Sequence, residues 1–144
     1  VVALARHVLE AAGTRTRGHA LTLHAPRKVT GQVDPIRLEQ VITNLVDNAI
    51  KYSPAGGPVD LRIAAQGATL RIVVTDRGIG IPPEHREKIF DRFHQAHQER
   101  RLGGMGLGLY ISREIVELHG GALVCEDSSE AGTRMAVTVP MAAP

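Results

Sequence analysis

Residues 34–53, DPIRLEQVITNLVDNAIKYS, decide the fold prediction because they join a helix start to a long amphipathic pattern. Asp34 is a typical N-cap residue, and Pro35 is favoured at the first helical position. The apolar residues that follow recur with a period near 3.6, which predicts one buried helix face. They are Leu38, Val41, Ile42, Leu45 and Ala49. The helix is expected to end where SPAGGP, residues 53–58, begins.

A polar strip runs beside this apolar face. At about 100° per residue, Asn44, Asn48 and Lys51 lie within about 60° of one another, and the apolar residues centre roughly 140° from Asn44. Tyr52 falls between the two groups, at about 80°. Such a strip is either a solvated helix face or the wall of a pocket, and the helix alone does not decide between them.

The rest of the chain predicts one α+β domain. Alternating patterns predict strands over 20–25, 59–65 and 69–75, and two further strands are expected over 122–126 and 134–139. A short helix is predicted over 3–12. A later helix is predicted to end at Gly120 and Gly121 and to carry on one face Leu107, Ile111, Ile115 and Leu118. We expect one mixed sheet with helices packed on one face.

Bulk composition excludes several classes of protein. The chain has 144 residues, 43% of them hydrophobic, and a net charge of +2 without a basic, aromatic-rich stretch, so we expect no nucleic-acid partner. Its single cysteine, Cys125, cannot form an internal disulfide, which fits a reducing compartment. No apolar run approaches the roughly 18–20 residues that cross a bilayer. We expect a cytoplasmic fragment without direct membrane contact, and its start at Val-Val-Ala suggests a longer parent protein, whose anchoring in a membrane stays open.

Two glycine clusters, DRGIG at 76–80 and GGMGLGL at 103–109, lack bulky side chains where a backbone can approach a ligand. The second opens a helix, whose free N–H groups suit a phosphate. Each cluster alone is weak evidence for a ligand site and is better explained by turns, which also use glycine. The second cluster matches neither a Rossmann fingerprint nor a Walker loop, since no Gly-Lys-Ser/Thr follows it.

Taken together, these motifs resemble the catalytic ATP-binding domain of sensor histidine kinases, within the GHKL ATPase superfamily. EQVITNLVDNAIKYS is similar to the N box, DRGIGIP to the first glycine box and IFDRFHQ to the F box. GGMGLGLYISREIVELHGG is similar to the second glycine box with its helix, and EAGTRMAVTVP to the last glycine box. The resemblance implies the Bergerat fold, a two-layer α/β sandwich in which about five strands of mixed sheet pack on about three helices.

The resemblance assigns the catalytic roles to Asn44, Asn48 and Lys51, which would also bind the nucleotide. Asn48 would coordinate Mg²⁺, an ion that prefers oxygen ligands and bridges phosphates. Asn44 would support the same ion or its waters, and Lys51 would offer a charge to a phosphate. Tyr52 would lay its ring against adenine.

At the base end, the resemblance makes Asp76 the acceptor for the adenine amino group. Gly78 and Gly80 would let the backbone approach the base. Ile81 would form an apolar wall, and Thr133 would reinforce the adenine contact directly or through water.

At the phosphate end, Gly104, Gly106 and Gly108 would shape the site and let a lid move, and Leu107 joins them in the nucleotide site. The lid spans 94–103 and carries Arg100 and Arg101. One reading makes it a solvated loop; the other has one arginine, taken as Arg101, reach the γ-phosphate. Phe90 and Phe93 are expected to anchor the lid in a hydrophobic slot. Met105 stands where the family usually has Thr, which would loosen one phosphate contact.

Asn44 separates the kinase branch from the hydrolase branch of the superfamily. The hydrolases place a Glu four residues before the magnesium-binding Asn, where it activates water. An amide cannot act as a general base near neutral pH, so hydrolysis should be slow. The resemblance therefore implies an ATP:protein-histidine phosphotransferase for two-component signalling, with ATP and Mg²⁺ as its cofactors.

The implied partners are a histidine-bearing dimerisation domain of the same kinase and a downstream response regulator. None of the seven histidines has the surroundings of a phosphoacceptor, so the acceptor is expected outside this chain. Residues 1–17 resemble a remnant of the interdomain helix and turn, and 18–144 form the catalytic domain. Two alternatives stay open, a serine/threonine kinase of the anti-sigma type and a non-catalytic, nucleotide-sensing interaction domain.

Overall fold

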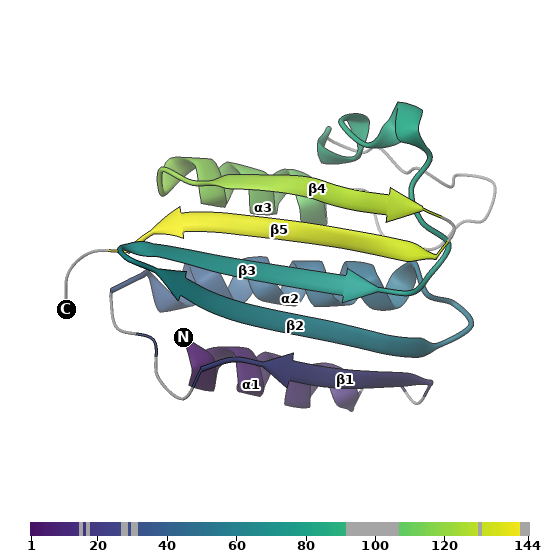
Figure 1. Ribbon diagram of the computed structural model, residues 1–144, viewed down its shortest axis with the longest axis horizontal. Coiled ribbons are helices and arrows are strands. Elements are labelled where there is room, and N and C mark those ends of the chain that lie inside the picture. The colour runs from purple at the N-terminus through teal and green to yellow at the C-terminus, as the bar shows by residue number, and fades with distance from the viewer. Residues whose placement is uncertain are drawn as a thin grey trace.

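A five-stranded mixed sheet forms the centre of the computed structural model, which describes residues 1–14, 16, 18–26, 29, 32–91, 107–129 and 131–141. The strand order is β1-β2-β3-β5-β4, and the only parallel pair among the described strands is β1 with β2 (Figure 1). The strands are β1 His19–His24, β2 Gly57–Gln66, β3 Thr69–Asp76, β4 Ala122–Ser129 and β5 Gly132–Pro140.

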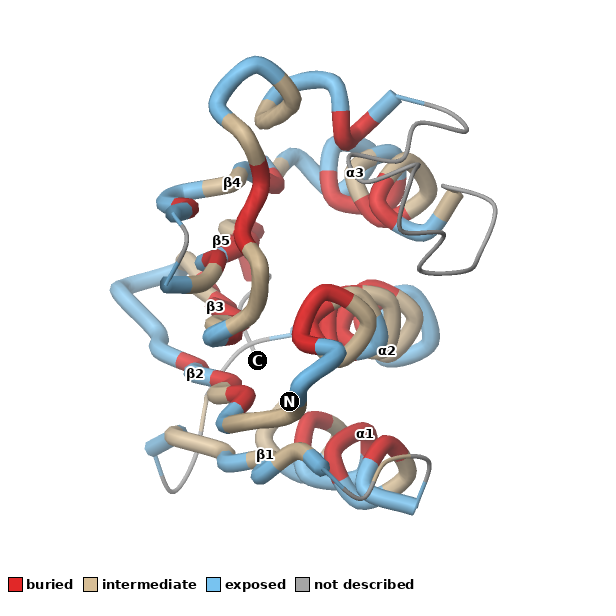
Figure 2. The backbone as a smooth tube through the Cα atoms, turned by 90° about the vertical axis from the view of Figure 1, so that its right-hand side faces the viewer, coloured by how far each residue is buried: buried red, intermediate tan, exposed pale blue. Residues whose placement is uncertain are grey.

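The three α-helices of the described residues all pack on the same face of this sheet (Figures 1 and 2). They are α1 Val2–Gly13, α2 Pro35–Lys51 and α3 Gly108–Leu118. Two short 3-10 helices, η1 Pro83–His85 and η2 Lys88–Phe90, lie between β3 and α3. The predicted two-layer α/β sandwich of about five strands and three helices is thereby confirmed.

Helix α2 follows its sequence prediction closely. The Asp34 carboxylate caps it by accepting from the backbone N–H groups of Ile36 at 3.0 Å and Arg37 at 3.2 Å. The predicted apolar stripe is buried against the sheet, with Ile42 0% exposed. This stripe fixes which way the polar strip of α2 faces, and so it positions the candidate site.

Helix α1 packs into the same core as the rest of the domain. Ala5 and Ala12 are 0% exposed, and α1 contacts both α2 and β1. The assignment of residues 1–17 to an interdomain remnant stays a prediction, with α1 contributing buried side chains to the catalytic domain.

One residue predicted on the buried face of helix α3 is exposed in the structure. Leu118 is expected on the apolar face, but its side chain is 83% exposed at the last helical residue. The buried residues of the helix are Leu109, Ser112, Ile115 and Val116. A polar residue, Ser112, is also 0% exposed, and its buried hydroxyl oxygen accepts from the Asn44 amide of α2.

Candidate functional site

The end of α2 nearest the glycine motifs carries the predicted polar strip. Asn44, Asn48 and Lys51 are each half-buried. The Asn44 amide Nδ2 lies 3.3 Å from the Gly108 carbonyl oxygen and 3.1 Å from Ser112 Oγ. A carbonyl can only accept, so the nitrogen must face Gly108, and the Asn44 oxygen is left to accept elsewhere. Asn44 therefore joins α2 to the start of α3.

Tyr52 links the end of α2 to the first glycine motif through its backbone. Its carbonyl accepts from the Ile79 N–H at 2.9 Å. A Cβ added to Gly78 would lie 1.9 Å from that same carbonyl oxygen, so only glycine fits here without displacing backbone. The tyrosine residue is 9% exposed, which places the ring mostly inside the fold rather than on an open surface.

Asp76 ends the inward-facing row of β3, in which Leu70, Ile72 and Val74 are buried. It is 6% exposed, and its Oδ1 accepts from the Gly78 N–H at 2.9 Å. Burial raises the pKa of the Asp76 carboxyl, while hydrogen bonds from the backbone of Gly78 and Thr133 oppose that rise. An acceptor kept in a desolvated place suits recognition of a polar ligand group.

Thr133 lies directly opposite Asp76 in the β3–β5 pairing and is 5% exposed. Its Oγ1 is 2.9 Å from Ser128 Oγ, which accepts from the Ile81 N–H at 2.7 Å. Ile81 is 3% exposed, consistent with the apolar wall expected there. Ser128 is not among the residues predicted from the sequence, although it ties two predicted site residues together.

The turn between β3 and η1 is held close to β4. Gly80 has a φ of 75°, and a Cβ there would lie 2.0 Å from the Ser129 carbonyl oxygen. The Arg86 Nη2 donates to the Ser128 carbonyl, so the segment after the turn is held against the same strand. The base end of the site is therefore built from backbone contacts that bulkier residues would break.

The structure describes only part of the predicted phosphate end of the nucleotide site. Arg101, Gly104 and Gly106 lie outside the described residues, as does Phe93. Leu107 is the N-cap of α3 and Gly108 its first residue, and no side chain of the described residues caps this helix. Phe90, the last residue of η2, is 4% exposed, and the Arg113 guanidinium of α3 lies 4.7 Å from its ring centroid, so this contact joins η2 to α3.

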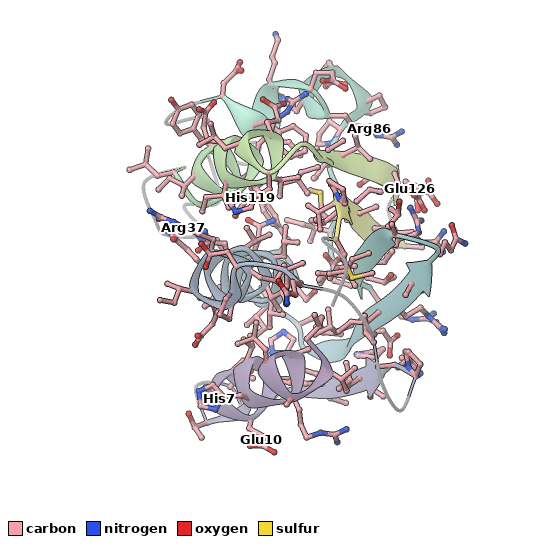
Figure 3. All side chains as sticks on the ribbon, turned by 90° about the vertical axis from the view of Figure 1, so that its left-hand side faces the viewer. His7, Glu10, Arg37, Arg86, His119 and Glu126 are labelled. Atoms are coloured by element: carbon pink, nitrogen blue, oxygen red, sulfur yellow. The ribbon has the colours of Figure 1, made fainter. Side chains whose placement is uncertain are left out.

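The described histidines have local partners or point outward. His19 bonds to the Ser53 carbonyl at 2.7 Å, His24 to Asp60 at 3.1 Å and His119 to the Ile115 carbonyl at 2.8 Å. His7 lies on the outer side of α1, away from the sheet (Figure 3).

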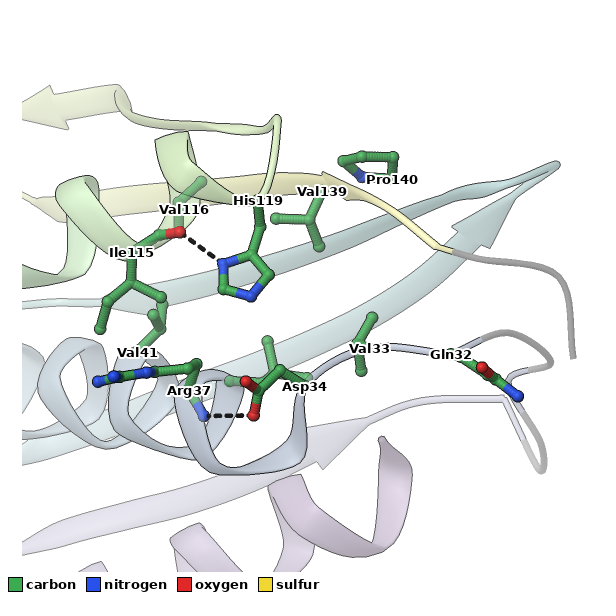
Figure 4. A pocket seen from close by; sticks show the side chains of 11 residues that line it. Gln32, Val33, Asp34, Arg37, Val41, Ile115, Val116, His119, Val139 and Pro140 are labelled. Carbon is green, nitrogen blue, oxygen red and sulfur yellow. Dashed lines mark hydrogen bonds between the residues drawn. The ribbon is translucent and has the colours of Figure 1, made fainter.

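A separate cavity of about 350 Å³ lies at the opposite end of α2 (Figure 4). Its lining includes Arg37 and Val41 of α2, Ile115 of α3 and His119. Among the described residues, none of those predicted for the nucleotide site lines it, so it is distinct from the candidate site.

The donors available for a metal ion are amide oxygens rather than an acidic or histidine-rich cluster. Within the described ranges, no group of three or more His, Cys, Asp or Glu side chains is suited to hold a metal. The donor proposed for Mg²⁺, the Asn48 amide, supplies an oxygen of the kind this ion accepts. The described helices include none long and apolar enough to cross a membrane.

Sequence comparisons match this chain to known ATPases and sensor kinases. The sequence model described as "Histidine kinase-, DNA gyrase B-, and HSP90-like ATPase" matches residues 33–143. The sensor histidine kinase WalK of Bacillus subtilis is 42% identical over 113 residues, covering 76% of this chain and 18% of WalK. The curated relatives compared are much longer, since the matches span between 12% and 26% of their lengths.

Solved structures of histidine kinases have the same fold as this chain. Full-length ShkA in complex with AMPPNP superposes with a TM-score of 0.87 and 29% identity, covering 99% of this chain and 30% of ShkA. The mycobacterial sensor histidine kinase MprB gives a TM-score of 0.81 and 29% identity, covering 99% of this chain and 95% of that structure. The chain thus belongs to the family of histidine kinase-, DNA gyrase B- and HSP90-like ATPases, and it is the catalytic ATP-binding domain of a histidine kinase.

Proposed function

We propose that this domain binds Mg-ATP and transfers the γ-phosphoryl group to a histidine on a separate dimerisation domain of its parent kinase. The observation that carries the proposal is the buried Asp76 facing Thr133, at the same end of the fold as Asn44, Asn48 and Lys51. The AMPPNP bound to ShkA supports a nucleotide as ligand.

In this proposal Asp76 selects the base by accepting from the adenine amino group, with Thr133 beside it. Ile81 and Tyr52 supply apolar contact to the ring. Gly78 and Gly80 hold the turn where close packing leaves no room for a side chain.

At the phosphate end, Asn48 would hold Mg²⁺, which supplies neutralisation of phosphate charge when bound. Lys51 would add a cation, and the N–H groups at Gly108, which no side chain of the described residues caps, suit a phosphate oxygen. Gly104, Gly106, Leu107 and Arg101 keep their predicted roles in shaping and closing this end. Phosphoryl transfer depends mainly on such positioning and charge neutralisation.

The absence of a carboxylate at position 44 supports transfer over hydrolysis. The Asn44 amide donates to Gly108 and Ser112, so it serves as a connector between helices and offers no base for water. ATP would thus persist until the acceptor histidine arrives. A response regulator would then receive the phosphoryl group, as the resemblance to sensor histidine kinases implies.

The test uses radiolabelled ATP with this domain alone, then with the dimerisation domain of its parent kinase. A third reaction uses the partner with its histidine changed to Gln. We expect acid-labile label on the partner only, and none on the Gln variant. Rapid hydrolysis without partner would indicate the ATPase branch, label on serine the anti-sigma branch, and no ATP binding a non-catalytic domain.

A further inference from the structure

The base end of the site contains two buried, hydrogen-bonded hydroxyl groups, and their other contacts determine which of the two donates to the other. Ser128 is 3% exposed and Thr133 is 5% exposed, and their oxygens are 2.9 Å apart. Ser128 Oγ also accepts from the Ile81 N–H at 2.7 Å. Among the described residues, these are the two hydrogen bonds found for the Ser128 hydroxyl.

The backbone amide fixes the direction of the second bond. The Ile81 N–H can only donate, so the Ser128 oxygen is an acceptor toward it. The single Ser128 hydroxyl hydrogen then has one described acceptor, Thr133 Oγ1. If Thr133 donated to Ser128 instead, the buried Ser128 hydroxyl hydrogen would have no acceptor among the described residues, at a cost of about 1–3 kcal/mol. Thr133 therefore accepts from Ser128, and its own hydroxyl hydrogen is left to point elsewhere.

The Thr133 hydroxyl is therefore a hydrogen-bond donor that lies beside an acceptor, the Asp76 carboxylate. Its backbone N–H bonds to the Asp76 carboxylate, which it faces across the β3–β5 pair. The edge of adenine offers an amino donor next to the ring nitrogen N1, an acceptor. Hypoxanthine and guanine present the opposite order, a carbonyl acceptor next to an N1–H donor. Of these three purines, an Asp acceptor next to a Thr donor is complementary to adenine only.

We propose that Ser128 is a specificity-determining residue of the nucleotide site, holding the Thr133 hydroxyl as a donor toward N1 of adenine. Ser128 acts through Thr133 and is a positioning residue. The inference rests on the proposed function, because it assumes that the base lies at Asp76.

The test compares ATP with inosine triphosphate, whose base is hypoxanthine, by calorimetry. In Ser128→Ala the Thr133 hydroxyl can reverse and accept from N1–H, so the ratio of the two dissociation constants should fall about tenfold. Asp76 still opposes the hypoxanthine carbonyl, so part of the preference remains. Ser128→Thr keeps a hydroxyl and should restore the ratio. Ser129→Ala, on the exposed neighbour, should leave it unchanged.

A structural role alone would weaken both nucleotides by the same factor, and that result would overturn the proposal. The wild-type domain gives a second readout that needs no variant. 1-Deaza-ATP, in which N1 is replaced by C–H, should bind about tenfold more weakly than ATP. Equal binding of the two would also overturn the inference. Failure of the wild-type domain to bind ATP at all would instead refute the proposed function.

Discussion

Replacing Asp76 with Asn should weaken ATP binding and at the same time leave the fold at least as stable. The substitution keeps the size of the side chain and leaves one oxygen for the two backbone N–H groups that bond to the carboxylate, those of Gly78, at 2.9 Å, and Thr133. The remaining position changes from an acceptor to an NH₂ donor, which faces the amino donor of adenine. A hydrogen bond to a charged group contributes about 1.5–3 kcal/mol, so ATP affinity should fall about 10- to 150-fold.

Asp76→Asn weakens ATP binding but should stabilise the fold, because burial raises the pKa of the Asp76 carboxyl. A carboxyl whose pKa is raised by folding favours the folded state when protonated. That contribution is complete below its ordinary pKa and is lost as the pH rises through the folded value. At neutral pH the charged Asp76 therefore costs stability, and the neutral amide introduced by Asp76→Asn relieves this cost. The gap between variant and wild type should shrink as the pH falls toward about 4.

Calorimetry with ATP measures the first effect, and thermal unfolding without nucleotide at pH 7.5 and 4.5 measures the second. Asp127→Asn, which removes an exposed carboxylate on β4, is the matched control and should change neither property by much. Wild-type affinity in Asp76→Asn would refute the placement of the base. A lower melting temperature at pH 7.5 would refute the reasoning about the buried charge.

Three further substitutions test other parts of the site. Asn48→Ala should abolish phosphotransfer and the magnesium dependence of ATP binding while the domain stays folded, as followed by a magnesium titration and circular dichroism. Gly78→Ala places a Cβ 1.9 Å from the Tyr52 carbonyl oxygen and should lower the free energy of unfolding by about 1–3 kcal/mol, measured by urea denaturation. Gly13→Ala, whose added Cβ meets no atom within 4 Å beyond its chain neighbours and the backbone of its own helix, is the control and should be nearly neutral. Asn44→Asp removes the amide hydrogens that bond to the start of α3, and hydrogen exchange in its first turn should become faster; unchanged protection would contradict the connector role.

Most of the fold is predictable because each element carries its own local signal. The cap at Asp34 and the apolar stripe of α2 appear in the structure as the sequence predicts. The strands over 59–65 and 69–75 are found as β2 and β3, slightly longer at their ends. The prediction for Leu118 is wrong because, at about 100° per residue, Leu118 lies on the opposite side of α3 from the buried Leu109 and Val116, and spacing alone does not show which side of the helix faces the core.

The sequence pattern misses Ser128 for a specific physical reason. Period-two alternation from the buried Leu123 would put Cys125, residue 127 and residue 129 on the inner face. A register shift between Cys125 and Asp127 moves the pattern by one, and Ser128 points inward instead. A β-bulge leaves no clear mark in a single sequence, so the partner of Thr133 could not be found without the structure. The connector role of Asn44 likewise depends on how α2 and α3 pack.

The pairing of β3 with β5 has a consequence for how the domain folds. β2 with β3 and β4 with β5 are neighbours in sequence, and such local pairs form early. Asp76 and Thr133 meet only when these two hairpins join, across the longest loop closure in the sheet. The nucleotide can therefore recognise the chain only after this late step. ATP should slow the unfolding of the domain and leave its refolding rate unchanged, so that nucleotide in the cell protects the finished fold without helping to make it.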